Sequence, residues 1–221
     1  MLSIAIPTYE MLGKGVEFLE YQFNIFLQQS FKDFEVVVSD HSLNESIKAL
    51  CKKYKDTLNI IYIKNELNRG NSSANINNAI KCCSGDIIKI LFQDDFLYKN
   101  TSLEKIYKTF TSEVVWAVTG SKTTSGAKMV PRYGLNIHHG VNTISSPSVL
   151  AIRNYKPLLF DENLIYLMDV EYYKRLYDTF GLPQILDDCL VVNRLWSGQV
   201  QQNIATETIR QELNYVKKIH D

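Results

Sequence analysis

The sequence has little of what marks several classes of protein. Its 221 residues carry no net charge, because 24 lysines and arginines balance 24 aspartates and glutamates. A protein that depends on nonspecific phosphate contacts carries a basic surface, so we expect no nucleic-acid partner. Only 10 glycines and 5 prolines accompany 13 tyrosines and 10 phenylalanines. This composition excludes a disordered chain and is typical of a globular protein with a large buried core.

Long apolar runs and paired cysteines are also missing. No run approaches the roughly 20 apolar residues that cross a bilayer, and the start MLSIAIPTYE lacks the charged region of a secretory signal. We therefore expect no integral membrane segment and a cytoplasmic protein. The four cysteines form no CxxC pair, and adjacent Cys82 and Cys83 suit neither a mutual disulfide nor a shared metal. We interpret all four as small apolar residues in a reducing compartment.

The first 119 residues alternate between two hydrophobic periods. Short, nearly continuous apolar runs predict strands that are buried on both faces of a parallel sheet. These runs span Leu2–Ile6, Phe34–Val38, Asn59–Ile63, Ile87–Phe92 and Val114–Thr119. Apolar residues at helical spacing between them predict helices over 17–30, 43–54, 76–83 and 103–110. Such alternation is typical of βαβ units in a doubly wound sheet flanked by helices, so the predicted class is α/β.

The second half of the chain is less regular. Residues 120–146 hold four glycines, a proline and many serines and threonines, which predicts a long loop of the kind that often carries function. A strand at 148–153, a turn at 161–163, a helix over 169–180, a strand at 185–192 and a helix near 204–220 follow. We expect one domain over 1–221, without internal repeats.

Polar residues follow four of the predicted strands. In a doubly wound sheet, ligands bind outside the carboxyl ends of the strands, so these positions are candidates for a site. They hold Pro7-Thr8-Tyr9, Ser39-Asp40-His41-Ser42, the segment Asn65–Gly70 with the helix start Asn71-Ser72-Ser73, and Gln93-Asp94-Asp95. An aromatic residue, three carboxylates and a helix N-terminus at one edge suit a nucleotide diphosphate with a metal ion. The alternatives are ordinary: helix-capping or turn aspartates, a plain loop and a core tyrosine.

The sequence motifs of other nucleotide-binding proteins and of acyl-transfer enzymes are absent or incomplete. Gly13-Lys14-Gly15 offers GxG after the first strand, but Phe18 stands where a dinucleotide fingerprint needs its third glycine. The chain has no GxxxxGK[ST] loop and no GxSxG elbow. A metal role for His138 and His139 is disfavoured, because adjacent histidines rarely aim at one ion.

Taken in order, several segments resemble a known family. SIAIPTYE, EVVVSDHS, NRGNSSANINNAIKCCSGDIIKILFQDDF, PSVLAIR and MDVEYYKRL are similar to segments of family 2 glycosyltransferases, which have the GT-A fold. The resemblance covers roughly residues 2–195. It implies a nucleotide-sugar-binding half over 1–119 and an acceptor-binding half over 120–221.

The resemblance also implies roles for individual residues. Pro7, Thr8 and Tyr9 would line the base pocket, Asp40 would accept a hydrogen bond from the base, and Asn68, Gly70 and Asn75 would shape the loop and helix under the nucleotide. Asp94 would lie near the ribose and the metal, and Asp95 would be the chief ligand of Mn²⁺ or Mg²⁺. Asp169 would be the general base, aimed from a helix N-terminus. The ordinary alternative at this position is an N-cap aspartate, and both interpretations can be true.

The sequence departs from the family pattern at three positions. Phe92 stands where the family has the first aspartate of its DxD motif, which leaves a Gln-Asp-Asp variant, and Met168 replaces a glutamate that often precedes the base. Trp196 occupies the place of a frequent histidine metal ligand. We expect Arg194 to face the diphosphate and Trp196 to contact the donor or acceptor sugar.

The predicted function is a metal-dependent, inverting transfer, of the hexosyltransferase type, from a nucleotide diphosphate sugar to a hydroxyl of a glycan or polysaccharide. A UDP-sugar is the first choice of donor, and GDP- and dTDP-sugars are alternatives because Asp40 could meet either base. One alternative is a nucleotide-sugar-binding protein without turnover, as the three departures suggest. A sugar nucleotidyltransferase ranks lower, because Gly13-Lys14-Gly15 is the only hint of its Gly-rich basic loop. A lipid-linked acceptor would bring the protein to the membrane surface.

Overall fold

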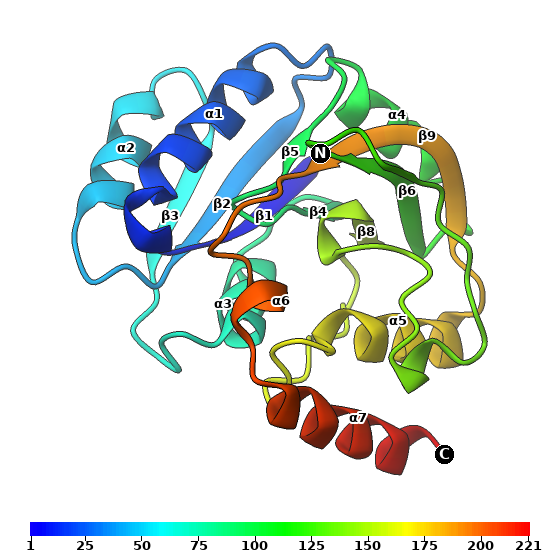
Figure 1. The fold of residues 1–221 in the computed structure, drawn as a ribbon. Helices are drawn as coiled ribbons and strands as arrows, with labels where there is room; N and C mark the ends of the chain where they lie inside the picture. The colour runs from blue at the N-terminus through cyan, green and yellow to red at the C-terminus, as the bar shows by residue number, and fades with distance from the viewer.

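A single mixed sheet organises the chain. The computed structural model describes residues 1–221 and contains nine strands, eight of them in the order β3-β2-β1-β4-β8-β6-β9-β5, with β7 paired to β6 (Figure 1). The first four strands in this order are parallel: β1 (Leu2–Thr8), β2 (Phe34–Asp40), β3 (Ile60–Lys64) and β4 (Ile87–Ile90). Residues of β1, β2 and β4 are buried throughout, which accounts for their near-continuous apolar sequence.

The order of these four strands creates a crevice. The chain moves outward from β1 to β2 and β3, then returns past β1 to β4. Right-handed crossovers therefore place α1 (Gly15–Leu27) and α2 (Ser46–Tyr54) on one face, and α3 (Ser72–Lys81) on the other (Figure 1). At such a reversal point the loops after adjacent strands separate, and ligands bind between them. The loops that follow β1 and β4 lie at this point.

The rest of the sheet contains strands of both directions. The antiparallel strand β8 (Leu150–Arg153) pairs with β4 and with β6 (Trp116–Thr123), and β6 runs parallel to β9 (Gln184–Asn193). The two-residue strand β5 (Phe96–Leu97) closes the far edge against β9. The helices of this part are α4 (Ser102–Thr109), α5 (Met168–Phe180), the short α6 (Val200–Asn203) and α7 (Thr206–His220).

Most predicted elements are confirmed, with shifts of a few residues at their ends. The predicted loop over 120–146 is wrong in part, because β6 continues to Thr123 and then turns into β7 (Lys128–Met129), which pairs with it. The segment also contains the 3-10 helix η2 (Ile137–His139). The two-residue strand β5 was not predicted, since two residues carry no periodicity. All four cysteines are free thiols, as predicted.

Candidate active site

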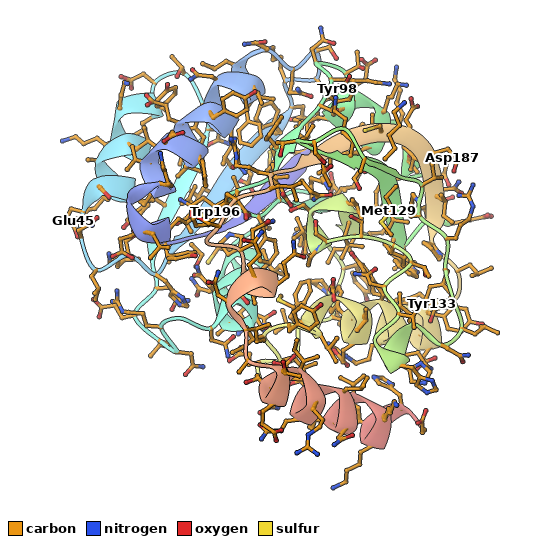
Figure 2. All side chains as sticks on the ribbon, in the orientation of Figure 1. Glu45, Tyr98, Met129, Tyr133, Asp187 and Trp196 are labelled. Atoms are coloured by element: carbon orange, nitrogen blue, oxygen red, sulfur yellow. The ribbon has the colours of Figure 1, made fainter.

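A cavity of about 490 Å³ opens at the carboxyl ends of β1 and β4. Residues from both halves of the chain line it, among them Tyr9, Asp94, Asp95, Asn142, Ser146, Asp169, Asn193 and Trp196. Trp196 and Met129, which Figure 2 labels, belong to its lining. The predicted site carboxylates Asp94, Asp95 and Asp169 therefore meet at one cavity. Asp95 and Asp169 are 74 positions apart along the chain.

Asp95 is held by groups from the second half of the chain. Its Oδ2 accepts hydrogen bonds from Asn193 Nδ2 at 2.9 Å and from Ser146 Oγ at 3.2 Å, and its Oδ1 accepts one from the backbone N–H of Arg194 at 3.1 Å. Burial, followed by the negative charge of Asp94, raises the pKa of Asp95 to about 7. The carboxylate is thus oriented by neutral donors that do not cancel its charge.

Asp94 is oriented by Trp196. The indole Nε1–H donates to Asp94 Oδ2 at 2.9 Å, and burial raises the pKa of this carboxyl above its ordinary value. The indole packs edge-on against Phe18, with ring centroids 5.4 Å apart. A Cβ on Gly198 would lie 2.1 Å from two carbons of the indole, so only glycine leaves room for this ring. The place of the family's histidine is therefore taken by a group that positions Asp94.

Two buried glutamines support the turn that carries both aspartates. Gln22, on α1, donates from Nε2 to the carbonyl groups of Phe92 and Asp95, at 2.7 and 2.6 Å. Gln93 accepts from the backbone N–H of Tyr9 at 2.9 Å and donates to the carbonyl of Gly15 at 2.8 Å. The glutamine of the Gln-Asp-Asp variant thus ties the end of β4 to the loop after β1, where Tyr9 lies.

The donor set around the two aspartates suits a hard divalent cation. Trp196 engages one carboxylate oxygen of Asp94, and Asp95 Oδ1 accepts a single backbone hydrogen bond, so each carboxylate keeps lone pairs for a metal. The buried amine of Lys89, on β4, donates to the carbonyl groups of Ser148 and Leu150 rather than to Asp95. Two desolvated carboxylates with neutral donors gain most from a bound cation.

Asp169 lies on the second residue of α5 and faces the same cavity. Its Oδ1 accepts from the backbone N–H of Val170 at 2.7 Å, and its Oδ2 accepts from Asn142 Nδ2 at 2.6 Å. Burial raises its pKa to about 7, whereas both hydrogen bonds favour the ionised form. A carboxyl that titrates near neutral pH is suited to accept a proton from a hydroxyl group.

The orientation of Asn142 is itself determined by the backbone. Its Oδ1 accepts from the N–H groups of Ile144 and Ser145, each at 2.9 Å, so its Nδ2 is left to face Asp169. An asparagine that binds backbone two residues on is a common turn element. The irregular segment after η2 thus holds the candidate base.

Asp169 is not the N-cap of α5, although its Oδ1 binds the N–H of Val170 in the first turn of the helix. The N-cap of α5 is Leu167, and the N–H groups of Ile165, Tyr166 and Leu167 are bound instead by the carboxylate of Glu212 at 2.8 to 3.0 Å. Glu212 is buried and lies on α7. The last helix thus holds the segment that leads into α5, and this helps to position Asp169 at the cavity.

Several residues predicted to contact the nucleotide do not line the cavity. Tyr9 does, but Pro7 and Thr8 are buried in β1. Asp40 is fully buried and accepts from Tyr62 Oη and from the N–H of Ser42, each at 2.8 Å. In this structure Asp40 braces β2 and β3 instead of facing the cavity.

The asparagines and the glycine under the predicted nucleotide site serve the local fold. Asn75 is buried and joins two strand ends, since it donates to the carbonyl of Thr8 at 3.1 Å and accepts from Ser39 Oγ at 2.7 Å. Asn68 donates to Glu162 at 3.0 Å, and Gly70 has a φ of +87°, which favours glycine. None of the three lines the cavity.

Arg194 is also placed differently from its prediction. Its guanidinium lies over the rings of Phe18, Phe96 and Tyr21, at 4.4, 5.1 and 5.2 Å from their centroids, and its Nε donates to the carbonyl of Asp94 at 3.0 Å. It does not line the cavity. Its contacts anchor the segment after β9 to α1, which holds Asn193 and Trp196 near the aspartates.

The residues that sequence reasoning missed are mostly amides and hydroxyl groups. They are Gln22, Gln93, Asn142, Ser146, Asn193, Gly198 and Glu212. Asn142, Ser146, Asn193 and Gly198 act through a carboxylate or an aromatic ring that the sequence did single out, whereas the other three bind backbone groups. Gln93 alone carried a signal, since it belongs to the Gln-Asp-Asp segment.

Comparison with protein families gives a match over most of the chain. The model described as glycosyl transferase family 2 matches residues 3–163. A GalNAc(5)-diNAcBac-PP-undecaprenol beta-1,3-glucosyltransferase from Campylobacter jejuni is 29% identical over 100 residues, which are 43% of this chain and 30% of that protein. The poly(ribitol-phosphate) beta-N-acetylglucosaminyltransferase TarS from Staphylococcus aureus is 30% identical over 101 residues, which are 45% of this chain and 17% of TarS.

Solved structures share the fold at low sequence identity. TarS residues 1–349 in complex with UDP-GlcNAc align with 96% of this chain and 65% of that one, with a TM-score of 0.69 and 17% identity. A mannosyltransferase from Pyrobaculum calidifontis, in complex with GDP-Man and Mn²⁺, aligns over 100% of this chain and 64% of its own, with a TM-score of 0.66 and 16% identity. The chain thus spans less than two thirds of these relatives.

Proposed function

Because this chain belongs to glycosyl transferase family 2, we propose that it transfers a sugar, with inversion, from a UDP-sugar to a hydroxyl group of a glycan acceptor. The observation that carries this proposal is the convergence of Asp94, Asp95 and Asp169 on one cavity, beside Tyr9 and Trp196. The nucleotide would occupy the side formed by residues 1–119, and the acceptor the side formed by 120–221.

The acidic end of the cavity would bind the diphosphate through Mn²⁺ or Mg²⁺, held by Asp94 and Asp95. When bound, the divalent ion stabilises the negative charge on the departing diphosphate. Asn193, Ser146 and the backbone of Arg194 hold Asp95 in place, and Trp196 holds Asp94. The exposed face of Tyr9 is available for stacking on the base, and its backbone is held by Gln93.

The other end of the cavity would activate the acceptor. Asp169 takes the proton of the acceptor hydroxyl as the oxygen attacks the anomeric carbon, on the face opposite the leaving diphosphate. One displacement on that face inverts the configuration. The hydrogen bonds from Asn142 and Val170 hold the carboxylate in place while it receives the proton.

The neighbours support a nucleotide-sugar donor, and one relative supports a glycan acceptor. One neighbour holds UDP-GlcNAc and another holds GDP-Man with Mn²⁺. The Campylobacter relative is named for a substrate linked to undecaprenol, so a lipid-linked acceptor would place this chain at a membrane surface. No helix of the structure has the length and apolar character needed to cross a bilayer.

Sugar transfer from a panel of nucleotide sugars, with Mn²⁺ or with a chelator, tests the proposal. We expect Mn²⁺-dependent transfer from a UDP-sugar, and no transfer after chelation. Binding of UDP with Mn²⁺ but no turnover on any acceptor would favour the alternative of a binding protein, for which the Trp196–Asp94 hydrogen bond is the specific observation. Equal turnover with and without metal would contradict the proposal.

A further inference from the structure

Two adjacent histidines converge on one aspartate outside the cavity. His138 and His139 end the 3-10 helix η2, and Asp221 follows the last residue of α7. Nε2 of His138 lies 3.0 Å from Asp221 Oδ1, and Nε2 of His139 lies 3.1 Å from the same oxygen. Adjacent histidines rarely aim at one ion, so the sequence alone disfavours a shared metal here. Here both rings instead aim the same nitrogen at one point.

The three atoms have nearly the spacing of a metal coordination sphere. They all lie within 4.8 Å of one another. In a tetrahedral zinc site, with bonds of about 2.0 to 2.1 Å, two ligand atoms are separated by roughly 3.3 Å. Each nitrogen–oxygen distance is therefore within a few tenths of an ångström of that edge, and small side-chain rotations would admit a cation among the three.

Regular structure holds the three side chains in place. The N–H of Asp221 donates to the carbonyl of Lys217 at 2.8 Å, so its backbone continues the last turn of α7. Gly140, with a φ of +84°, ends η2 directly after the histidines, and a Cβ there would contact Leu213 of α7 at 3.4 Å. The ligands thus come from two packed elements rather than from a mobile tail.

The cluster is accessible to an ion from one side. The side chain of His138 is only 8% exposed, whereas that of Asp221 is 51% exposed, so water reaches the carboxylate and could complete the coordination. Nδ1 of His138 has no hydrogen-bond partner, so no second contact determines which ring nitrogen carries the proton. Its Nε2 can therefore present a lone pair to a cation.

Plain hydrogen bonding is the competing explanation. Both imidazoles would then donate to the same oxygen of Asp221, and their contacts lower the pKa of this carboxyl. Such a pair would not select among cations. A cation would use both nitrogens and the oxygen as ligands at once, and mixed imidazole and carboxylate ligands suit zinc rather than the magnesium that all-oxygen sites prefer.

We propose that His138, His139 and Asp221 form a site for Zn²⁺ that joins η2 to α7, with water as the fourth ligand. The site is distinct from Asp94 and Asp95 and does not depend on the proposed sugar transfer. Its ligands are 82 and 83 residues apart in the chain, so the ion would tie two distant segments together. The tied segment continues to Asn142, which contacts Asp169.

Zinc binding in an Asp94→Asn/Asp95→Asn background, free of histidine tags, isolates this site from the cavity. We expect one tightly bound Zn²⁺ per chain and a thermal midpoint raised by about 5 °C or more at saturation. His139→Gln and Asp221→Asn should each weaken the affinity by about tenfold or more. His41→Gln is the matched control, because this histidine contacts Leu67 and lies outside the cluster.

Cobalt gives a spectroscopic readout of the site in the same background. Co²⁺ bound to this site should show the intense visible absorption of a four-coordinate nitrogen and oxygen site, and Zn²⁺ should remove it. Weak octahedral absorption, or affinities that are equal in the control, His139→Gln and Asp221→Asn proteins, would overturn the proposal. Because the background lacks the cavity aspartates, this result is independent of whether sugar transfer is observed.

Discussion

The two halves of the molecule hold their acidic groups in different ways. In residues 1–119, Asp94 and Asp95 follow a buried parallel strand, at the point where the strand order reverses. In residues 120–221, Asp169 lies on the first turn of a helix and is held by an asparagine from an irregular segment. The strand order of the sheet thus determines where Asp94 and Asp95 lie, whereas local hydrogen bonds determine the position of Asp169.

The halves nevertheless depend on each other at Asp95. Its side chain comes from the first half, but its three donors belong to Ser146, Asn193 and Arg194 of the second. Asp169, in contrast, contacts only groups of its own half. Changes in the second half should therefore affect the metal-binding end as well as the base, whereas changes in the first half should leave the base intact.

Replacing Asp95 should have the largest effect. Asp95→Asn keeps the volume of the side chain but removes its charge, so we expect sugar transfer to fall by about 1000-fold, as for loss of a main electrostatic group. Steady-state transfer rates at saturating Mn²⁺ measure this. Asp188→Asn is the control, because Asp188 is a partly exposed carboxylate that pairs with Lys99 and Lys105. Similar rates in both variants would contradict the role of Asp95.

Replacing Asp169 should affect turnover alone. Asp169→Asn removes the proton acceptor, so we expect kcat to fall by about 100-fold or more while the affinity for UDP with Mn²⁺ is unchanged. In the native protein, kcat should rise as the pH increases through about 7, because only the ionised carboxylate accepts a proton. A pH profile of kcat that is flat between pH 5 and 9 would count against this base.

Replacing Asn142 should lower the ionised fraction of Asp169 without removing the carboxylate. Asn142→Ala deletes a hydrogen bond that favours ionised Asp169, so the pKa of the base rises and the pH profile of kcat moves to higher pH. We expect a loss of about tenfold at pH 6 that is smaller at pH 9. Asn136→Ala is the control, since this exposed residue precedes η2 and its side chain makes no capping bond. A uniform loss at every pH would indicate a general structural defect instead.

Replacing Gly198 should have the smallest effect. Gly198→Ala displaces the indole of Trp196 and breaks its bond to Asp94, which should raise KM for the nucleotide sugar by about fivefold. Trp196→Phe removes the same hydrogen bond. The two changes together should therefore cost little more than either one, and fully additive effects would show that Gly198 acts elsewhere.

The sequence predicted the parts of the molecule in which apolar residues recur at the spacing of a strand or a helix. The α/β class, the GT-A fold and the family are confirmed, because buried strands, amphipathic helices and ordered motifs are repetitive or local signals. The convergence of Asp95 and Asp169 was predicted from the order of the motifs that resemble the family. The contacts of Asp40 and Arg194 did not, since Tyr62 and the rings around Arg194 are neighbours only in three dimensions.

The remaining errors share one physical cause. An aspartate before an apolar helix is usually its N-cap, but α5 begins one residue earlier, at Met168, so Leu167 is the N-cap and Asp169 lies inside the first turn. Residues 120–146 looked like a loop because a two-residue strand has no measurable period. Both cases concern the end of a helix or a very short strand, where a single sequence carries no periodic signal.

Calorimetric titration of UDP into the native protein, with Mn²⁺ and then with a chelator, tests the central claim most directly. Asp94 and Asp95 can attract a diphosphate only through a cation, because two carboxylates repel it. The account predicts that UDP binds with Mn²⁺ and that its affinity falls by about 100-fold or more without metal. Equal affinity under both conditions would show that the two aspartates do not bind the nucleotide through a metal.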